Sequence, residues 1–129
     1  MVGAALRYAL LLYMDPVRAA ATTAAEARRE LTAYAAITDD LAQRGLLHGG
    51  EAFLPAEMAR FVRGNGEHPG DDAVTSGDRE LSGFYIVACD EEQALEIAAS
   101  MPVVDHGVVE VRPLLDLPQP GASSDDAPS

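Results

Sequence analysis

The segment Glu80–Pro102, ELSGFYIVACDEEQALEIAASMP, predicts a strand that runs directly into a helix. Apolar residues occupy both alternating faces of the strand, with Phe84, Ile86 and Ala88 on one side and Tyr85, Val87 and Cys89 on the other. Because both faces are apolar, we expect this strand to lie in the centre of a sheet. Asp90 and Gln93 have the spacing of a helix N-cap and its partner, and Pro102 is expected to end the helix. The helix is expected to run through Ala94, Leu95, Ala98 and Met101.

The first third of the chain predicts another strand followed by a helix. Leu6–Met14, LRYALLLYM, is short and apolar and is followed by an Asp-Pro breaker, so we expect a buried strand. Thr23–Glu26 has the form of a capping box and predicts a long helix. This helix is expected to end near Arg44, because Gly45 can adopt a left-handed conformation. Its buried stripe is expected to contain Leu31, Tyr34, Thr38 and Leu41.

The rest of the chain predicts shorter strands, a loop and a tail. Leu46–Leu54 and Met58–Arg63 predict two short strands joined at Pro55. Gly64–Asp72 is dense in turn formers and is expected to be an exposed loop. Val108–Leu114 predicts the last strand. The polar run from 118 to 129 lacks apolar residues to bury, so we expect one domain over 1–117 and a disordered tail.

The predicted order of elements, β-α-β-β-β-α-β, indicates an α+β fold of the ferredoxin-like type. Two helices would cover one face of an antiparallel sheet, and the other face would be open. In the last strand Val109 and Val111 suit the helix side, which leaves Val108, Glu110 and Arg112 on the open face. A large exposed apolar face is rare on a monomer. We therefore expect a homodimer of the dimeric α/β-barrel type, with a small-molecule cavity between two facing sheets.

Composition argues against several classes of function. The 129 residues carry a formal charge of -12, which repels nucleic-acid backbones and anionic membranes, so we expect neither partner. Cys89 is the single cysteine, which excludes an internal disulfide and fits a reducing cytoplasm. The apolar N-terminal segment is far shorter than the ~20 residues that span a bilayer. No nucleotide-binding motif occurs and the three histidines are scattered, so we expect no cofactor and no metal.

Several segments, taken in order, resemble the YCII-related superfamily, and in particular the branch named for its DGPF motif. They are YALLLYMD at Tyr8–Asp15, the helix at Tyr34–Leu41, GLLHGGEAFLP at Gly45–Pro55, LSGFYIVACDEEQALEIAASMP at Leu81–Pro102 and GVVEVRPL at Gly107–Leu114. The resemblance covers most of residues 5 to 115. It implies the fold described above and a dimer.

Two positions depart from the pattern of these relatives. Where the branch would place Asp-Gly-Pro-Phe, this chain has Asp71-Asp72-Ala73-Val74, which keeps only the Asp and loses the Gly-Pro turn. YCII proteins resemble one another in a His on the first helix, where this chain has Tyr34, so a His-Asp acid/base pair of that type cannot be transferred. The family is functionally mixed: some relatives are dehalogenating lyase-like enzymes, and others are encoded beside alternative sigma factors. The resemblance therefore implies fold and dimer with more force than chemistry.

Two histidines are candidates for proton transfer. His48 and Glu51 lie three apart on a predicted strand and face opposite sides, unless Gly49-Gly50 forms a bulge that brings imidazole and carboxylate together. Otherwise they are a surface His and a solvated Glu. His106 follows Asp105 in the turn before the last strand. These two are too close in sequence to hydrogen-bond easily, so a partner for His106 would come from elsewhere in the fold.

Ligand contacts are expected on the open face. Glu110 and Arg112 form either an ion pair at a dimer interface or an anchor for a substrate carboxylate or enolate. The further substrate-binding candidates are the phenols Tyr8, Tyr34 and Tyr85, which can equally be packing residues. Asp71, the retained residue of the motif, is a further catalytic candidate.

Acid/base groups are the only catalytic equipment that the sequence offers. We therefore expect a cofactor-independent small-molecule enzyme or binder, with lyase or isomerase chemistry on a cyclic or aromatic metabolite. The alternative is a non-catalytic accessory or ligand-sensing protein in a transcriptional regulatory circuit, which the sigma-factor association of relatives suggests. A paralogue that only heterodimerises is a third hypothesis, which the lost Gly-Pro turn favours.

Overall fold

The structure, a computed structural model, describes residues 6–64, 66–68 and 79–116. Four strands form an antiparallel sheet in the order β2-β5-β1-β6, and β3 and β4 form a separate pair. The elements are β1 (Arg7–Met14), α1 (Pro16–Ala20), α2 (Ala24–Gln43), β2 (Leu47–Ala52), η1 (Ala56–Met58), β3 (Phe61–Arg63), β4 (Gly66–His68), β5 (Glu80–Ala88), α3 (Glu91–Ala99), η2 (Pro102–Asp105) and β6 (Gly107–Pro113). The central position predicted for the strand at Glu80–Cys89 is confirmed, because β5 lies between β2 and β1.

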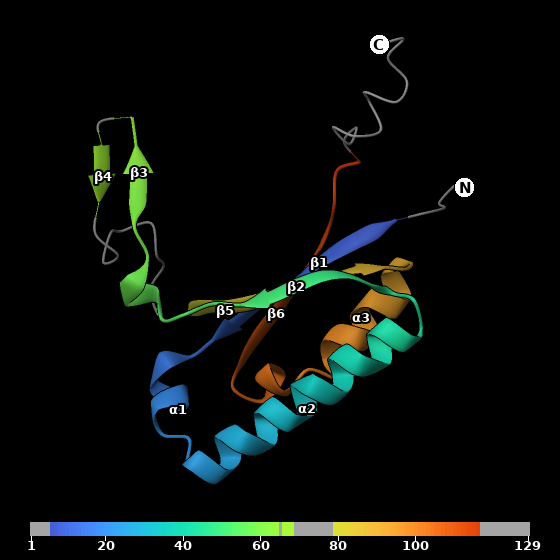
Figure 1. Ribbon diagram of the computed structural model, residues 1–129, viewed down its shortest axis with the longest axis horizontal. Coiled ribbons are helices and arrows are strands. Elements are labelled where there is room, and N and C mark those ends of the chain that lie inside the picture. Colours follow the sequence, from blue (N-terminus) through green and yellow to red (C-terminus); the bar gives the residue numbers. More distant parts are fainter. Residues whose placement is uncertain (1–5, 65, 69–78, 117–129) are drawn as a thin grey trace.

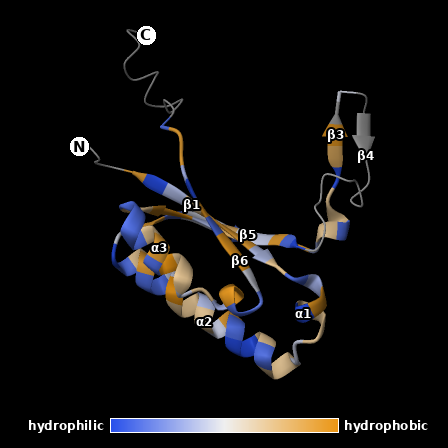
Figure 2. Ribbon diagram, turned by 180° about the vertical axis from the view of Figure 1, so that it is seen from behind, coloured by the Kyte–Doolittle hydropathy of each residue, from blue (hydrophilic) through white to orange (hydrophobic). Residues whose placement is uncertain are grey.

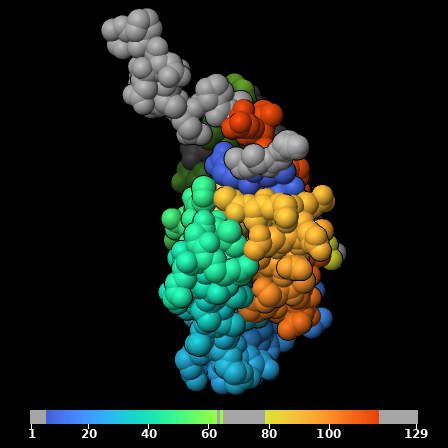
Figure 3. Space-filling model, turned by 90° about the vertical axis from the view of Figure 1, so that its right-hand side faces the viewer, coloured from blue at the N-terminus to red at the C-terminus, as the bar shows by residue number. Residues whose placement is uncertain are grey.

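α2 and α3 lie against one face of the four-stranded sheet (Figure 1). The space-filling view shows them side by side as the outer layer of that face (Figure 3). The core lies between helices and sheet, and its largest fully buried side chains are Leu10, Leu41, Val87 and Met101. Hydrophobic residues gather on the crossing strands and on α3, whereas α2 carries long hydrophilic stretches (Figure 2). The predicted mixed α/β architecture with an open antiparallel sheet is confirmed.

Local capping groups set the limits of the helices. At α2, Thr23 Oγ1 accepts the Glu26 N–H at 3.1 Å and Glu26 Oε1 accepts the Thr23 N–H at 2.9 Å, which is the predicted capping box. Gly45 follows the helix with a φ of 72°, as expected for a left-handed end. At α3, Asp90 Oδ1 accepts the Gln93 N–H at 2.8 Å. The short α1 was not predicted, and Asp15 caps it by accepting the Val17 N–H at 3.0 Å.

The segment after β2 differs from the predicted strand and loop. The strand expected over Met58–Arg63 is only β3, because η1 occupies Ala56–Met58. The loop expected over Gly64–Asp72 contains β4, which pairs with β3 so that Val62 lies opposite Glu67. The rest of this expected loop, from residue 69 on, lies outside the described residues. The pair of β3 and β4 stands away from the main body of the domain (Figure 1).

Leu31, which the helical stripe predicted to be buried, lies at the surface, and so does Leu95. Leu31 on α2 is 69% exposed and Leu95 on α3 is 51% exposed. Ile37 and Ile97 pack against the core in their place. The N-terminal half of α2 extends beyond α3 (Figure 1). Helical spacing alone therefore did not show which face of this half is covered by another element.

The face of the sheet turned away from the helices is here called the open face. The strand registers place six apolar or aromatic side chains on it, namely Leu11, Tyr13, Leu81, Phe84, Ile86 and Val108. Val109 and Val111 pack on the helix side, as predicted. Phe53, which follows β2, adds a ring 5.8 Å from that of Phe84. The open face is therefore apolar over most of its central strands.

Candidate functional site

A cavity of about 700 Å³ lies between α2, η2 and the helix side of the sheet. Its apolar lining includes Leu12, Met14, Leu47 and Val103. Its polar lining comprises Glu30, Tyr34, Thr38, Glu51, Ser82, Tyr85 and His106. This size and mixture of surfaces are typical of small-molecule sites. The cavity lies under the long helix, whereas the sequence led us to expect a cavity on the open face.

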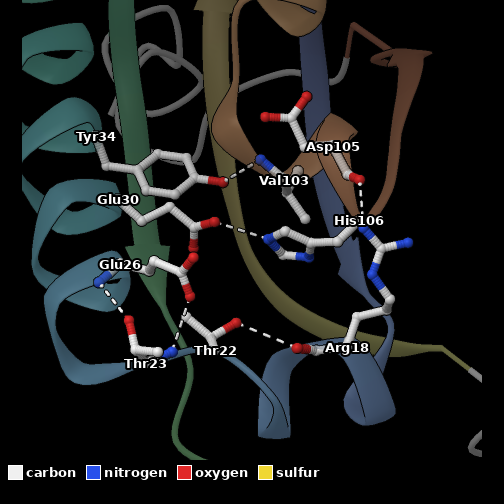
Figure 4. A network of polar contacts seen from close by, with 9 residues as sticks. All are labelled: Arg18, Thr22, Thr23, Glu26, Glu30, Tyr34, Val103, Asp105 and His106. Atoms are coloured by element: carbon white, nitrogen blue, oxygen red, sulfur yellow. Dashed lines mark hydrogen bonds and ion pairs between the residues drawn. The ribbon is translucent and has the colours of Figure 1, made fainter.

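His106 and Glu30 form the central polar pair of this cavity. His106 Nε2 lies 2.7 Å from Glu30 Oε2, and the two side chains point toward each other from the turn before β6 and from α2 (Figure 4). The His106 side chain is 15% exposed and that of Glu30 is 34% exposed. The partner expected for His106 from a distant part of the fold is thus Glu30, which sequence reasoning missed. Its signal was available, because Glu30 lies four residues before Tyr34 and so on the same side of the helix.

The backbone around His106 fixes the position of its ring. The His106 N–H donates to the Val103 carbonyl at 3.0 Å, and Arg18 Nη2 donates to the Asp105 carbonyl at 3.1 Å (Figure 4). The second bond ties α1 to the turn that carries His106. Asp105 therefore takes part through its backbone, rather than as a carboxylate that orients the imidazole.

The hydrogen bond to Glu30 assigns the proton on the imidazole. A carboxylate can only accept, so Nε2 carries the hydrogen that points at Glu30 Oε2. Nδ1 is buried and has no hydrogen-bond partner among the described residues. A second hydrogen on Nδ1 would be a buried donor with no acceptor. The geometry therefore places one hydrogen on Nε2, directed at Glu30, and gives Nδ1 no acceptor among the described residues.

Tyr34 supplies a hydrogen-bond donor beside this pair. Its hydroxyl oxygen accepts the Val103 N–H at 3.0 Å, so the hydroxyl hydrogen is left for another acceptor (Figure 4). Burial raises the pKa of Tyr34 to about 12. The phenol therefore stays protonated at neutral pH and can donate to a ligand oxygen.

Thr38 and Tyr85 form a second polar pair in the lining. Thr38 Oγ1 donates to the Tyr34 carbonyl at 2.9 Å and lies 2.9 Å from the Tyr85 hydroxyl. Because Thr38 has one hydroxyl hydrogen, Tyr85 is the donor in the second bond. The pair fixes the Tyr85 ring against α2 and leaves its oxygen able to accept.

His48 and Glu51 are not joined in this structure. The strand register shifts between Leu47 and Gly49, so a bulge does occur, but it lies at His48 itself rather than at Gly49-Gly50. His48 is exposed and lies outside the cavity lining, whereas Glu51 is part of it. No hydrogen bond links the two side chains within the described part of the chain.

Glu110 and Arg112 lie on the open face, as predicted from their alternation. Arg112 Nε donates to Glu110 Oε2 at 2.7 Å and Nη2 donates to the same oxygen, while the Tyr13 hydroxyl donates to Glu110 Oε1 at 3.1 Å. Burial, and then the bond to Glu110, raise the pKa of Tyr13. Both sides of the Glu110 carboxylate are thus occupied from within the chain.

The remaining predicted residues are separated from one another. Tyr34 and Tyr85 line the cavity, but Tyr8 is 6% exposed and packs in the core. Asp71, and with it the Asp71–Val74 stretch, lies outside the described residues. Among the described residues no group of three or more His, Cys, Asp or Glu side chains is arranged to hold a metal ion. In the same part of the chain, no helix has both the length and the apolarity to cross a membrane.

Fold and site together define a small α/β domain in which a cavity under the long helix carries a carboxylate–imidazole pair and two phenols. Comparison with known families agrees with this class. Residues 6–118 match the YCII-related domain, and the chain belongs to this family. The match spans every strand and helix described above. No curated protein matches the sequence.

Proposed function

We propose that the cavity binds a cyclic or aromatic small molecule and moves a proton on it without a cofactor, as a lyase or an isomerase. The observation that carries the proposal is the Glu30–His106 pair, joined at 2.7 Å in the same cavity as the protonated Tyr34. A base and a hydrogen-bond donor that face one ligand are the minimum for proton abstraction beside a carbonyl.

The three side chains have distinct roles in this proposal. Glu30 Oε2 is held by the His106 Nε2–H, so Oε1 is the oxygen that takes a proton from a carbon of the ligand. The electron pair of the broken C–H bond moves onto the adjacent carbonyl oxygen, and Tyr34 donates a hydrogen bond to the resulting enolate. Return of the proton to another carbon gives an isomerase, and departure of a leaving group from the next carbon gives a lyase. His106 acts as a positioning residue for Glu30.

We also propose a fold type, a family branch and an oligomeric state for this domain. We place the domain among ferredoxin-like folds and in the DGPF branch, which the strand order β2-β5-β1-β6 and the sequence segments quoted above support. We also propose a homodimer that pairs through the open face, because six apolar or aromatic side chains lie there with no other element to cover them among the described residues. A cytoplasmic location remains our prediction from the single cysteine.

The direct test starts with the natural ligand. The protein is purified from its own host and examined by native mass spectrometry before and after mild denaturation. We expect a dimer that releases a defined small molecule. That molecule is then incubated with the protein in deuterated water, and deuterium incorporation or product formation is followed by NMR. Glu30→Gln should reduce the rate by at least about a hundredfold, whereas Glu92→Gln, a matched change on the exposed side of α3, should leave it unchanged.

One observation favours a second function, that of a non-catalytic accessory or ligand-sensing protein. The segment between β2 and β4 exposes apolar side chains outside the body of the domain: Leu54 is 72%, Met58 62% and Val62 79% exposed. Such a row is typical of a surface that contacts another protein. A purified complex with one regulatory protein and an empty cavity would favour this function over the enzyme. The Glu30→Gln variant should then bind that partner as the wild type does.

A further inference from the structure

The charged groups in the cavity lining are of one sign. Glu30 lies in it on the helix side; Glu51 also borders the cavity, but its register partner Phe84 lies on the open face. Among the described residues of the lining there is no arginine. The chain contains no lysine, so arginine is the only permanent cation that could enter such a site. The arginine seen beside the His106 turn is Arg18, and its Nη2 is bonded to the Asp105 carbonyl rather than to either glutamate.

The other polar groups of the lining supply no permanent cation. His106 donates its Nε2 hydrogen to Glu30, and its other nitrogen is buried. The Tyr34 and Tyr85 phenols present polar oxygens and ring surface, to which a cation is attracted. The formal charge of -12 on the whole chain adds a field of the same sign around the entrance.

We propose that this cavity selects its ligand by charge: it takes a one- or two-ring ligand that carries a protonated amine, accepts the uncharged analogue less well, and rejects the carboxylate. The ammonium group would lie within the field of the Glu30 carboxylate without displacing a C–H bond from Oε1, while the ring lies on Leu12, Met14 and Val103. The inference rests on the proposed function in one respect, namely that this cavity is where a small molecule binds. It does not require that the ligand be turned over.

Three matched probes test the proposal on the full chain. They are 2-naphthylmethylamine, 2-naphthalenemethanol and 2-naphthoate, which share one ring system and differ in charge. Isothermal titration at neutral pH and physiological salt should give the tightest Kd for the amine, a Kd roughly fivefold weaker for the alcohol, and a further loss of about tenfold for the carboxylate.

Variants show whether the charge preference comes from this cavity. Glu30→Gln keeps a side chain that can accept from His106 but removes the charge, so the advantage of the amine over the alcohol should fall to about onefold to twofold. The alcohol should bind the variant as it binds the wild type. Glu92→Gln removes the same charge from exposed α3 and should change none of the three affinities.

The outcomes separate this inference from the proposed function. Naphthoate binding as tightly as the amine, no binding of any of the three probes, or an amine advantage that survives in Glu30→Gln would each overturn the charge selectivity. The predicted ranking in a protein that moves no proton on its natural ligand would support the selectivity and overturn the acid/base proposal. Turnover of an anionic natural ligand would do the reverse.

Discussion

Replacing Tyr34 by Phe tests the contact that joins α2 to the turn carrying His106. The Tyr34 hydroxyl oxygen accepts the Val103 N–H at 3.0 Å, and Val103 is 2% exposed. Without the hydroxyl this N–H becomes a buried donor with no acceptor, which costs about 1–3 kcal/mol of unfolding free energy. The ring itself is retained, so little of the loss should come from packing.

Urea unfolding followed by circular dichroism measures the effect. Tyr34→Phe should lower the midpoint without changing the slope, because the surface exposed on unfolding is nearly the same. Tyr85→Phe is the matched control: it removes a hydroxyl that donates to Thr38, and Thr38 keeps its own bond to the Tyr34 carbonyl. This control should cost less than about 1 kcal/mol, because no donor is stranded. Equal losses in the two variants would refute the reasoning.

Three further predictions concern pH, a glycine and the open face. The pKa of Tyr34 is raised from 10.0 to about 12 in the folded protein, so its contribution to stability is complete below pH 10 and is lost as the pH rises toward 12. Urea unfolding across this range should show a smaller fall in unfolding free energy for Tyr34→Phe than for wild type. Gly107→Ala should destabilise by more than about 2 kcal/mol, since its new Cβ would clash with the backbone carbonyl oxygen of Tyr13 in β1. Gly45→Ala has open space and should cost about 1 kcal/mol for its positive φ, so equal losses in thermal or urea unfolding would contradict this. Phe84→Glu on the open face should shift the protein from dimer to monomer in light scattering coupled to size-exclusion chromatography. Leu31→Glu, at an exposed position of α2, should leave the dimer intact. A Phe84→Glu variant that stays dimeric would place the interface elsewhere.

Features that depend on neighbouring residues in the chain were predictable from the sequence. The capping box at Thr23, the N-cap at Asp90 and the left-handed Gly45 each act within a few residues, and all three are present. The central strand at Glu80–Cys89 was predictable because a strand with apolar residues on both faces usually lies inside a sheet rather than at its edge. Alternation also placed Val109 and Val111 correctly on the helix side.

The cavity was not predictable in the same way, because its groups meet only after the chain has folded. Glu30 and His106 lie 76 residues apart in sequence, and neither has a motif that points to the other. The helical stripe identified Tyr34 and Thr38 but also the exposed Leu31. Periodicity shows which residues share one face of a helix, but not how much of that face another element covers. The bulge in β2 was expected from Gly49-Gly50, but strand pairing with β5 moved it to His48.

The position of β1 has a consequence for synthesis of the protein. β1 is made first, yet both strands that pair with it, β5 and β6, lie beyond residue 79. During translation at roughly 5–20 residues per second, the apolar run of β1 must therefore wait several seconds for its partners. Loop closure over such separations is slow, so β1 keeps an unpaired edge until β6 has left the ribosome. A chain that ends before β6 would leave one edge of β1 unpaired. Such a truncated chain should aggregate rather than form a smaller stable domain.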